Sequence, residues 1–261
     1  MLKTIDFIEK LEKFAPLSLS KKMIEKGAYD NSGLLVNSSN EVTGALFTLD
    51  LTESAVKKAK VLGVNTIVTH HPAIYAPLST VSAFDTVSSA VHLAIGYGIN
   101  VISMHLNLDI CEGGIDACLC QALGGTEYKI INYITEKEGY GREFKLGVTF
   151  GEFAKTVKQT FGSKRVLTYG NKNAKLNCGA SFCGAGGHDA IAYVKSKGKA
   201  NVIITSDLAH HEIKEILDNG KALVILPHYT AEEYGFNKFY GWVKANVGNL
   251  PTYYMADKRF K

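Results

Sequence analysis

The segment Gly63-Val64-Asn65-Thr66-Ile67-Val68-Thr69-His70-His71-Pro72 holds a short apolar run that ends in two adjacent histidines and a proline. It follows a similar apolar run over residues 44–49 and an amphipathic stretch over residues 53–62. Two short apolar strands joined by an amphipathic helix are typical of a buried, largely parallel sheet. The sequence therefore predicts an α/β protein.

The same alternation continues along the rest of the chain. Apolar runs short enough for strands occupy residues 44–49, 66–69, 100–103, 180–183, 201–205 and 222–226. Helices are predicted over residues 53–62, from Asp85 to about Gly96 or Gly98, over residues 187–197, and from an N-cap at Asp207 to about Leu217. The more polar segment 128–175 is predicted to form peripheral strands, loops and one helix.

A weak internal repeat supports a division into two lobes. In the first half, a strand, a helix and a second strand lead to the pair His70 and His71, and in the second half the same order leads to Lys199-Ala200-Asn201-Val202-Ile203-Ile204-Thr205-Ser206-Asp207-Leu208-Ala209-His210-His211. We predict two related α/β lobes that face one another. The N-terminal lobe is placed at residues 1–125 and the C-terminal lobe at residues 126–261.

Composition excludes several classes of protein. With 261 residues, 46% hydrophobic and 21% charged, the chain is of ordinary globular type, neither disordered nor fibrous. The net charge of +4 comes without a dense basic stripe, so no nucleic-acid partner is expected. The five cysteines form no CxxC pair, which indicates reduced thiols in the cytoplasm. Residues 86–108 carry no charged side chain, but polar residues interrupt them too often for a membrane span, so no membrane contact is expected.

Most of the histidines follow predicted strands. They are His70, His71, His105, His210, His211 and His228. In open α/β sheets the ligand site lies at the carboxyl ends of the strands, so these side chains are expected to converge there. His92 and His188 fall within or at the start of helices and are interpreted as structural.

Three short segments carry imidazole groups, and the second and third of them also carry a carboxylate. They are Thr69-His70-His71-Pro72, His105-Leu106-Asn107-Leu108-Asp109 in a loop after a strand, and His228-Tyr229-Thr230-Ala231-Glu232. In the last, the histidine and the glutamate share a face if a helix begins near Pro227. His211 and Glu215 have the same spacing, and the spacing alone favours neither pair.

Imidazole nitrogen with carboxylate oxygen, and no thiolate, suits Zn, Mn, Fe, Co or Ni as divalent ions. Two adjacent histidines, a third histidine and two carboxylates are enough for two ions if one carboxylate bridges them. Two ions about 3.5 to 4 Å apart can hold and acidify a shared water.

The glycine-rich turn Cys183-Gly184-Ala185-Gly186-Gly187 is interpreted as a tight strand-to-helix turn in preference to a phosphate cradle.

Taken in order, four motifs resemble those of the NIF-three-like family, also described as GTP cyclohydrolase type-two homologues or dinuclear metal-binding proteins. The first motif is Tyr29-Asp30-Asn31-Ser32-Gly33-Leu34-Leu35-Val36, and the others are the three segments that begin at Thr69, His105 and His228. The resemblance spans the chain from Tyr29 to Glu232. It implies a two-lobed α/β fold assembled as a homohexamer around an internal cavity.

Carried over by position, the resemblance implies two divalent metal ions per subunit. The metal ligands it implies are His70, His71, Asp109, His228 and Glu232, with Glu232 as the bridge. It thereby favours His228 and Glu232 over His211 and Glu215. His211 and His105 are implied to lie near the ions, as catalytic groups that move a proton.

This sequence departs from the family pattern at three positions: Tyr29 replaces a tryptophan, and Ser206 and Pro227 each replace a glycine. The regulatory-like domain that larger family members insert between the lobes has no room in 261 residues. Because only two of the five implied ligands are acidic, two divalent ions would leave a positive pocket that attracts a small anionic substrate.

Two functions of different class are expected. The first is a metal-dependent hydrolase that acts on a nucleotide, a phosphoester or a cyclic-amide-type substrate. The alternative is a non-catalytic hexamer for metal binding, metal delivery, scaffolding or regulation.

Overall fold

A computed structural model describes residues 2–86 and 88–260 of the chain, which fold into two compact units. Unit 1 comprises residues up to Cys111 together with Phe236–Arg259, and unit 2 comprises Glu112–Gly235 together with Phe260. This division differs from the predicted single boundary at residues 125 and 126. The reason is that the chain returns to unit 1 near its end, where the aromatic rings of Phe236 and Phe239 pack against Phe47.

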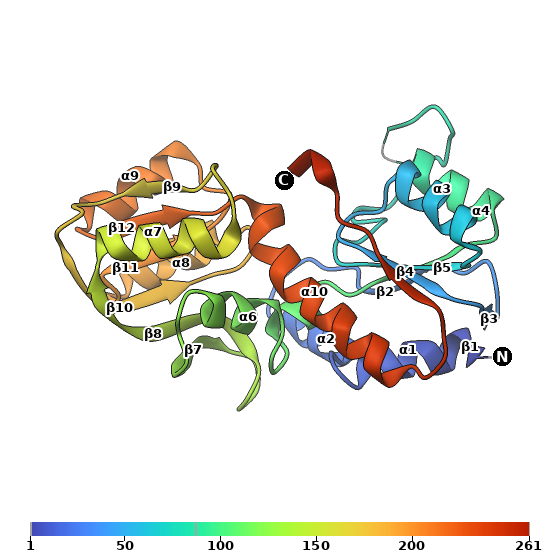
Figure 1. Cartoon of the computed structure of the whole chain (residues 1–261), viewed down its shortest axis with the longest axis horizontal. Coiled ribbons are helices and arrows are strands. Elements are labelled where there is room, and N and C mark those ends of the chain that lie inside the picture. Colours follow the sequence, from blue (N-terminus) through green and yellow to red (C-terminus); the bar gives the residue numbers. More distant parts are fainter. Residues whose placement is uncertain (1, 87, 261) are drawn as a thin grey trace. The chain divides into compact units, whose positions relative to one another are not determined.

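Unit 1 is built on a five-stranded sheet in the order β13-β4-β5-β6-β2, in which only β2 runs antiparallel to its neighbour. Its strands are β2 (Gly33–Val36), β4 (Ala45–Thr48), β5 (Thr66–Thr69), β6 (Asn100–Ser103) and β13 (Thr252–Tyr254), with a separate pair of β1 (Leu2–Lys3) and β3 (Glu41–Val42). Its helices are α1 (Thr4–Glu12), α2 (Leu17–Glu25), α3 (Glu53–Leu62), α4 (Ser89–Gly96) and α5 (Leu106–Ile110). Figure 1 shows α3 and α4 on one face of this sheet and α1 and α2 on the other.

The local sequence explains the central strands and their connection. Every residue of β4, β5 and β6 is buried, as expected for strands covered on both faces. The Thr52 side chain caps α3 by accepting a hydrogen bond from the amide of Ala55, and Gly63 ends the helix with φ of +70°. In the register, Thr69 lies opposite both Thr48 and Ser103, so the carboxyl ends of the three strands are level.

Unit 2 is built on a six-stranded sheet in the order β7-β8-β10-β11-β12-β9, with a parallel centre from β10 to β12. Its strands are β7 (Tyr128–Tyr133), β8 (Gly139–Thr149), β9 (Leu167–Tyr169), β10 (Lys175–Ser181), β11 (Val202–Thr205) and β12 (Ala222–Ile225). Its helices are α6 (Ile115–Ala122), α7 (Phe150–Phe161), α8 (Gly187–Lys195) and α9 (His210–Asp218). The long helix α10 (His228–Asn246) begins in unit 2 and ends in unit 1, and a short 3-10 turn covers Lys258–Phe260.

The predicted α/β class is confirmed, and several predicted boundaries are corrected. Helix α4 begins at Ser89, four residues after the predicted start at Asp85, whose carboxylate accepts hydrogen bonds from the amide and hydroxyl of Ser88. Val87, within the predicted helix, lies outside the described residues. Helix α9 begins at His210 and not after an N-cap at Asp207. Asp207 has φ of +35° and directs its carboxylate to His228 instead.

Two further segments differ from the prediction. The segment His105 to Asp109, expected as a loop, folds from Leu106 as the short helix α5. Strand β10 begins at Lys175, within the segment predicted to be peripheral, because it pairs with both β8 and β11. In the described part of the chain, no helix is both long enough and apolar enough to cross a bilayer.

Candidate metal centre

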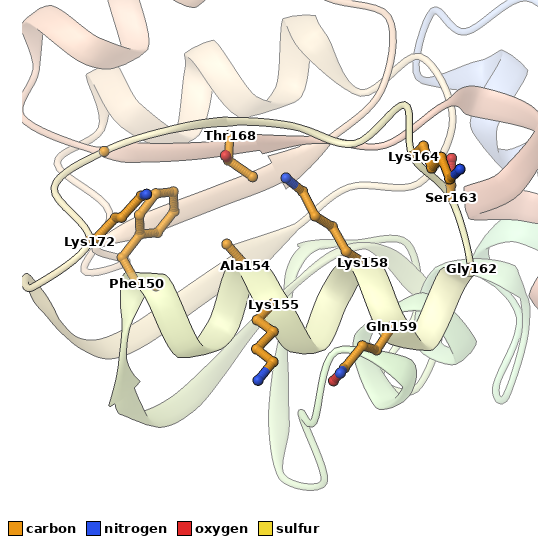
Figure 2. Close-up of a pocket in the computed structure, with 12 residues that line it drawn as sticks. Phe150, Ala154, Lys155, Lys158, Gln159, Gly162, Ser163, Lys164, Thr168 and Lys172 are labelled. Carbon is orange, nitrogen blue, oxygen red and sulfur yellow. The ribbon is translucent and has the colours of Figure 1, made fainter.

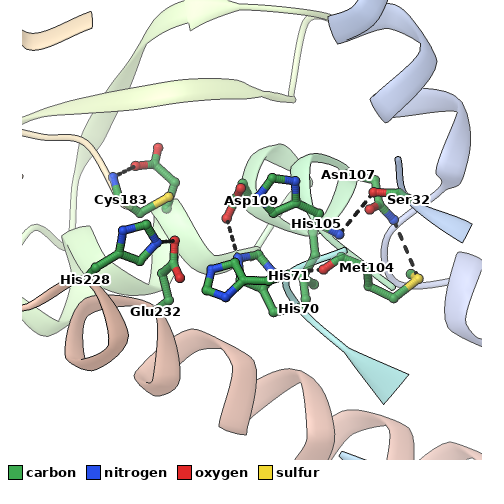
Figure 3. Close-up of polar contacts among 12 residues, drawn as sticks. Ser32, His70, His71, Met104, His105, Asn107, Asp109, Cys183, His228 and Glu232 are labelled. Atoms are coloured by element: carbon green, nitrogen blue, oxygen red, sulfur yellow. Dashed lines mark hydrogen bonds and ion pairs between the residues drawn. The ribbon is translucent and has the colours of Figure 1, made fainter. Parts of the chain in front are cut away.

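His70 is the most deeply buried member of a cluster in unit 1. It directly follows β5 and is fully buried, and its Nδ1 lies 2.8 Å from the carbonyl oxygen of Met104. Because a carbonyl only accepts, Nδ1 carries a proton, and in the neutral ring the lone pair is on Nε2. Nε2 lies 3.5 Å from Oδ1 of Asp109 (Figure 3). A lone pair that faces a carboxylate oxygen favours a cation between them.

Asp109 is held in place by the burial of α5. Asp109 is 5% exposed, and Asn107 in the same helix is fully buried. The Asn107 side-chain amide donates to the carbonyl of Ala15 at 2.7 Å, and its backbone amide donates to the hydroxyl of Ser20 at 3.0 Å. These bonds fix α5 against the segment that leads into α2, so the carboxylate of Asp109 is presented in one position.

His71 lies beside His70, with ring centroids 4.9 Å apart. The two histidines face neighbouring positions because the strand ends in a turn, in which both of their backbone amides donate to the carbonyl of Leu49. Nδ1 of His71 lies 2.7 Å from Oδ1 of Asp50, the residue two places beyond the end of β4. That carboxylate orients the ring, so Nε2 is the ring atom that could bind a metal ion.

His105 completes the cluster of unit 1. Its ring lies 5.2 Å from that of His70, and its Nδ1 lies 2.7 Å from Oδ1 of Asp30. Burial alone would raise the pKa of Asp30, but hydrogen bonds from His105, Ser20 and Ser32 outweigh it and hold that pKa below its usual value. One ligand atom each from His70, His105 and Asp109 lies within 4.8 Å of the others, so this group could hold a metal ion.

Unit 2 contains a second pair of a histidine and a carboxylate. His228 and Glu232 lie one turn apart at the start of α10, as predicted, with 2.9 Å between Nε2 and Oε1 (Figure 3). Asp207 contacts Nδ1 of His228 and orients the ring. The pair thus repeats the arrangement of His70 and Asp109, in which Nδ1 is held from outside and Nε2 faces a carboxylate oxygen.

The glycine-rich turn before α8 makes room for this pair. Gly184 has φ of +58°, and a Cβ atom there would lie 2.4 Å from Oε1 of Glu232. The turn is anchored by Asp116, whose Oδ1 accepts a hydrogen bond from the amide of Cys183 at 3.1 Å. The predicted tight turn is therefore also a close approach of backbone to Glu232.

Other residues singled out from the sequence are not members of these groups. His210 and His211 are exposed in the first turn of α9, and Glu215 forms an ion pair with Lys195 at 3.1 Å. His92 and His188 are exposed on α4 and α8. The sequence analysis missed three carboxylates that orient histidines: Asp30, Asp50 and Asp207. Position alone distinguishes them and does not identify their partners: Asp30 lies in the motif that begins at Tyr29, and Asp50 and Asp207 lie two residues beyond the ends of β4 and β11.

The carboxylates behind the histidines give a first prediction. Replacing Asp50 with asparagine is expected to weaken metal binding about tenfold or more, because the substitution removes the charge that orients and polarises His71. Competition with a chromophoric chelator measures this affinity. Asp6→Asn, which changes an exposed carboxylate in α1, serves as the control and should bind metal as the unchanged protein does. Equal affinities for all three proteins would exclude this role for Asp50.

The protonation of His228 gives a second prediction. Burial lowers the pKa of His228, but hydrogen bonds and charge from Glu232 and Asp207 outweigh it and raise the pKa to about 9. The metal-free ring is therefore protonated at neutral pH, and binding of a cation at Nε2 must release that proton. Metal affinity should rise by about tenfold per pH unit between pH 7 and 9 and then level off. Metal titrations across this range test it, and an unchanged slope in His228→Ala would refute the assignment to His228.

The fold and the clusters define a two-unit α/β protein with histidine and carboxylate groups that could bind metal ions. The sequence model of one protein family, described as Duf34/NIF3 (NGG1p interacting factor 3), matches residues 2–256 of the chain. The chain belongs to this family.

Individual relatives agree with this assignment. A protein of Lactococcus lactis named GTP cyclohydrolase 1 type 2 homolog is 32% identical over 232 residues, which cover 87% of this chain and 86% of the relative. The solved structure of reduced HcgD from Methanocaldococcus jannaschii superposes with a TM-score of 0.82 at 28% identity, covering 97% of each chain. The Staphylococcus aureus protein SA1388 gives a TM-score of 0.84 at 24% identity over 97% of this chain and 96% of its own, which supports the fold.

Proposed function

We propose that the chain binds two divalent metal ions through His70, His71, Asp109, His228 and Glu232, with Glu232 as the bridging ligand. The observation that carries the proposal is the repeated pairing of a histidine Nε2 with a carboxylate oxygen, at 3.5 Å in unit 1 and 2.9 Å in unit 2. Nitrogen and oxygen ligands without thiolate suit Zn, Fe, Mn, Co or Ni.

The positions of residues along α10 support the proposal that the His70–Asp109 and His228–Glu232 pairs belong to one metal centre. Phe236 lies four residues after Glu232 in this helix, and residues four apart share a helix face. The ring of Phe236 lies 6.0 Å from the ring of His70, within unit 1. Glu232 thus shares its helix face with Phe236, the residue whose ring lies beside His70 within unit 1.

We propose further that the centre serves a hydrolase. The chemistry that two divalent ions supply when bound is the acidification of a water molecule at neutral pH. His105 is suited to take up a proton, since Asp30 holds its Nδ1 and leaves Nε2 available. The exposed His211 is the second proposed proton carrier. A nucleotide, a phosphoester or a cyclic amide is the proposed substrate, in keeping with the cyclohydrolase name of the relatives.

Turnover by the metal-loaded protein tests the hydrolase proposal. The protein is screened against nucleotides, phosphoesters and cyclic amides, and any activity is measured again in Glu232→Gln. We expect the rate to fall by about a hundredfold or more, because the substitution removes the bridging charge. Glu233→Gln, which changes the next residue on α10, should retain the rate. A rate that is insensitive to Glu232→Gln would contradict the proposal.

The burial of the ligands favours a second candidate function, which is metal storage or delivery, or a structural or regulatory role, without catalysis. His70 is fully buried and Glu232 is 2% exposed, as expected for an ion that is held and not exchanged. Exchange of a radioactive metal, measured together with the number of metal-bound waters, separates these functions. A delivery site should exchange its ion readily, a structural site should hold its ion with no open coordination position, and a catalytic site should keep a bound water. For either function we propose a homohexamer in the cytoplasm, and for the hydrolase we propose a small anionic substrate.

A further inference from the structure

A basic pocket in unit 2 involves none of the proposed metal ligands. It lies beside α7, has a volume of about 650 Å³, and is lined in part by Phe150, Lys158, Gly162, Lys164, Thr168 and Lys172 (Figure 2). Its size falls within the range of small-molecule sites. The lining contains four lysines and no aspartate or glutamate.

The side chains of the four lining lysines point in different directions. Figure 2 shows the Lys158 side chain pointing from α7 toward the side chain of Thr168, whereas Lys155 points away on the other side of the helix. Lys172 lies beside the first turn of α7 and Lys164 just beyond its last turn. Within residues 2–86 and 88–260, no carboxylate forms an ion pair with any of these lysines.

The backbone holds this arrangement in place. The amide of Gly151 donates to the carbonyl of Lys172 at 2.9 Å, and the amide of Phe150 donates to the carbonyl of Ala174 at 2.9 Å, so the loop that carries Lys172 is fixed to the start of α7. Gly170 has φ of +157°, and a Cβ there would lie 2.9 Å from the Phe150 ring. The loop is therefore a preformed wall of the pocket.

We propose that this pocket binds a small molecule that carries a chain of two or more phosphate groups. Several ammonium groups without acidic partners repel one another, and a polyanion relieves this repulsion. Lysine is a common partner of phosphate, and the Thr168 hydroxyl adds a neutral donor. The length of α7, about 18 Å for twelve residues, sets the lysines at its two ends far enough apart to favour an elongated anion over a single phosphate.

Calorimetric titration of the full chain with tripolyphosphate, and separately with ATP, tests the proposal. We expect Lys158→Gln and Lys172→Gln each to weaken binding about tenfold or more, because each removes a charged hydrogen bond to the ligand. Lys197→Gln removes the same charge from an exposed position of unit 2 outside the lining of the pocket, so it should weaken binding less than about threefold. The metal content of all three variants should equal that of the unchanged protein, which separates this site from the metal centre.

Three results would overturn the proposal. The first is an absence of binding at millimolar ligand. The second is an equal effect, or no effect, of the three substitutions, which would assign binding to general surface charge or to the metal centre. The third is tighter binding of a DNA oligonucleotide with the same dependence on Lys158 and Lys172, which would assign the pocket to nucleic acid.

Discussion

His70→Ala is expected to remove at least one metal ion per chain, with a loss of affinity greater than the tenfold to hundredfold typical of residues behind the ligands. The reason is geometric. His70 is fully buried, Met104 fixes its Nδ1, and Nε2 faces Asp109 at 3.5 Å, so no exposed group can replace the lost nitrogen. Metal content after dialysis, measured by inductively coupled plasma mass spectrometry, gives the result directly.

A matched histidine substitution makes this experiment specific. His92 lies exposed on α4, and His92→Ala should leave the metal content unchanged. Circular dichroism spectra of both variants should match that of the unchanged protein, since His70→Ala removes a polar ring and not an apolar core residue. A folded His70→Ala protein with full metal content would show that the cluster of unit 1 is not a metal site.

Asp116→Asn is expected to lower the midpoint of thermal unfolding by about 6 to 20 °C. Asp116 and Arg142 form a buried ion pair in unit 2, with 2.9 Å between Oδ2 and Nη1, and they are 0% and 1% exposed. Removal of one partner leaves a buried charge without compensation, which costs about 3 to 5 kcal/mol. For chains of this size, each kcal/mol corresponds to about 2 to 4 °C.

Two further variants test whether the unpaired charge is the cause. Asp116→Asn combined with Arg142→Met should be more stable than Asp116→Asn alone, because the second substitution removes the stranded charge. Glu53→Gln breaks the exposed ion pair with Lys57 on α3 and should leave the midpoint unchanged. A small effect of Asp116→Asn, equal to that of Glu53→Gln, would show that the buried charge of Arg142 does not destabilise unit 2 when it is left unpaired.

Patterns local in sequence were enough to predict the central strands and to place His228 and Glu232 on one helix face, although they did not favour this pair over His211 and Glu215. Residues 66–69 and 100–103 were predicted as strands with the bounds that the structure gives, since an apolar run with β-branched residues has few other uses in an α/β chain. The helix after Pro227 brings His228 and Glu232 together by its own periodicity. Neither inference needs knowledge of distant contacts.

Tertiary contacts explain what the sequence did not predict. Asp30 contacts His105 across 75 residues and Asp50 contacts His71 across 21, and nothing in the local pattern marks either carboxylate as a partner. Asp207 was predicted as a helix cap by its type, but its contact with His228 overrides that preference. The return of β13 to pair with β4 likewise joins segments more than 200 residues apart.

The most direct test of the central claim is anomalous diffraction from crystals of the metal-loaded protein. The proposal predicts two peaks per chain, about 3.5 to 4 Å apart, with the carboxylate of Glu232 between them. It also predicts ligand distances of about 2.0 to 2.2 Å to His70, His71, Asp109 and His228. A crystal with no anomalous peak at these side chains, or with a single peak that Glu232 does not contact, would contradict the dinuclear centre.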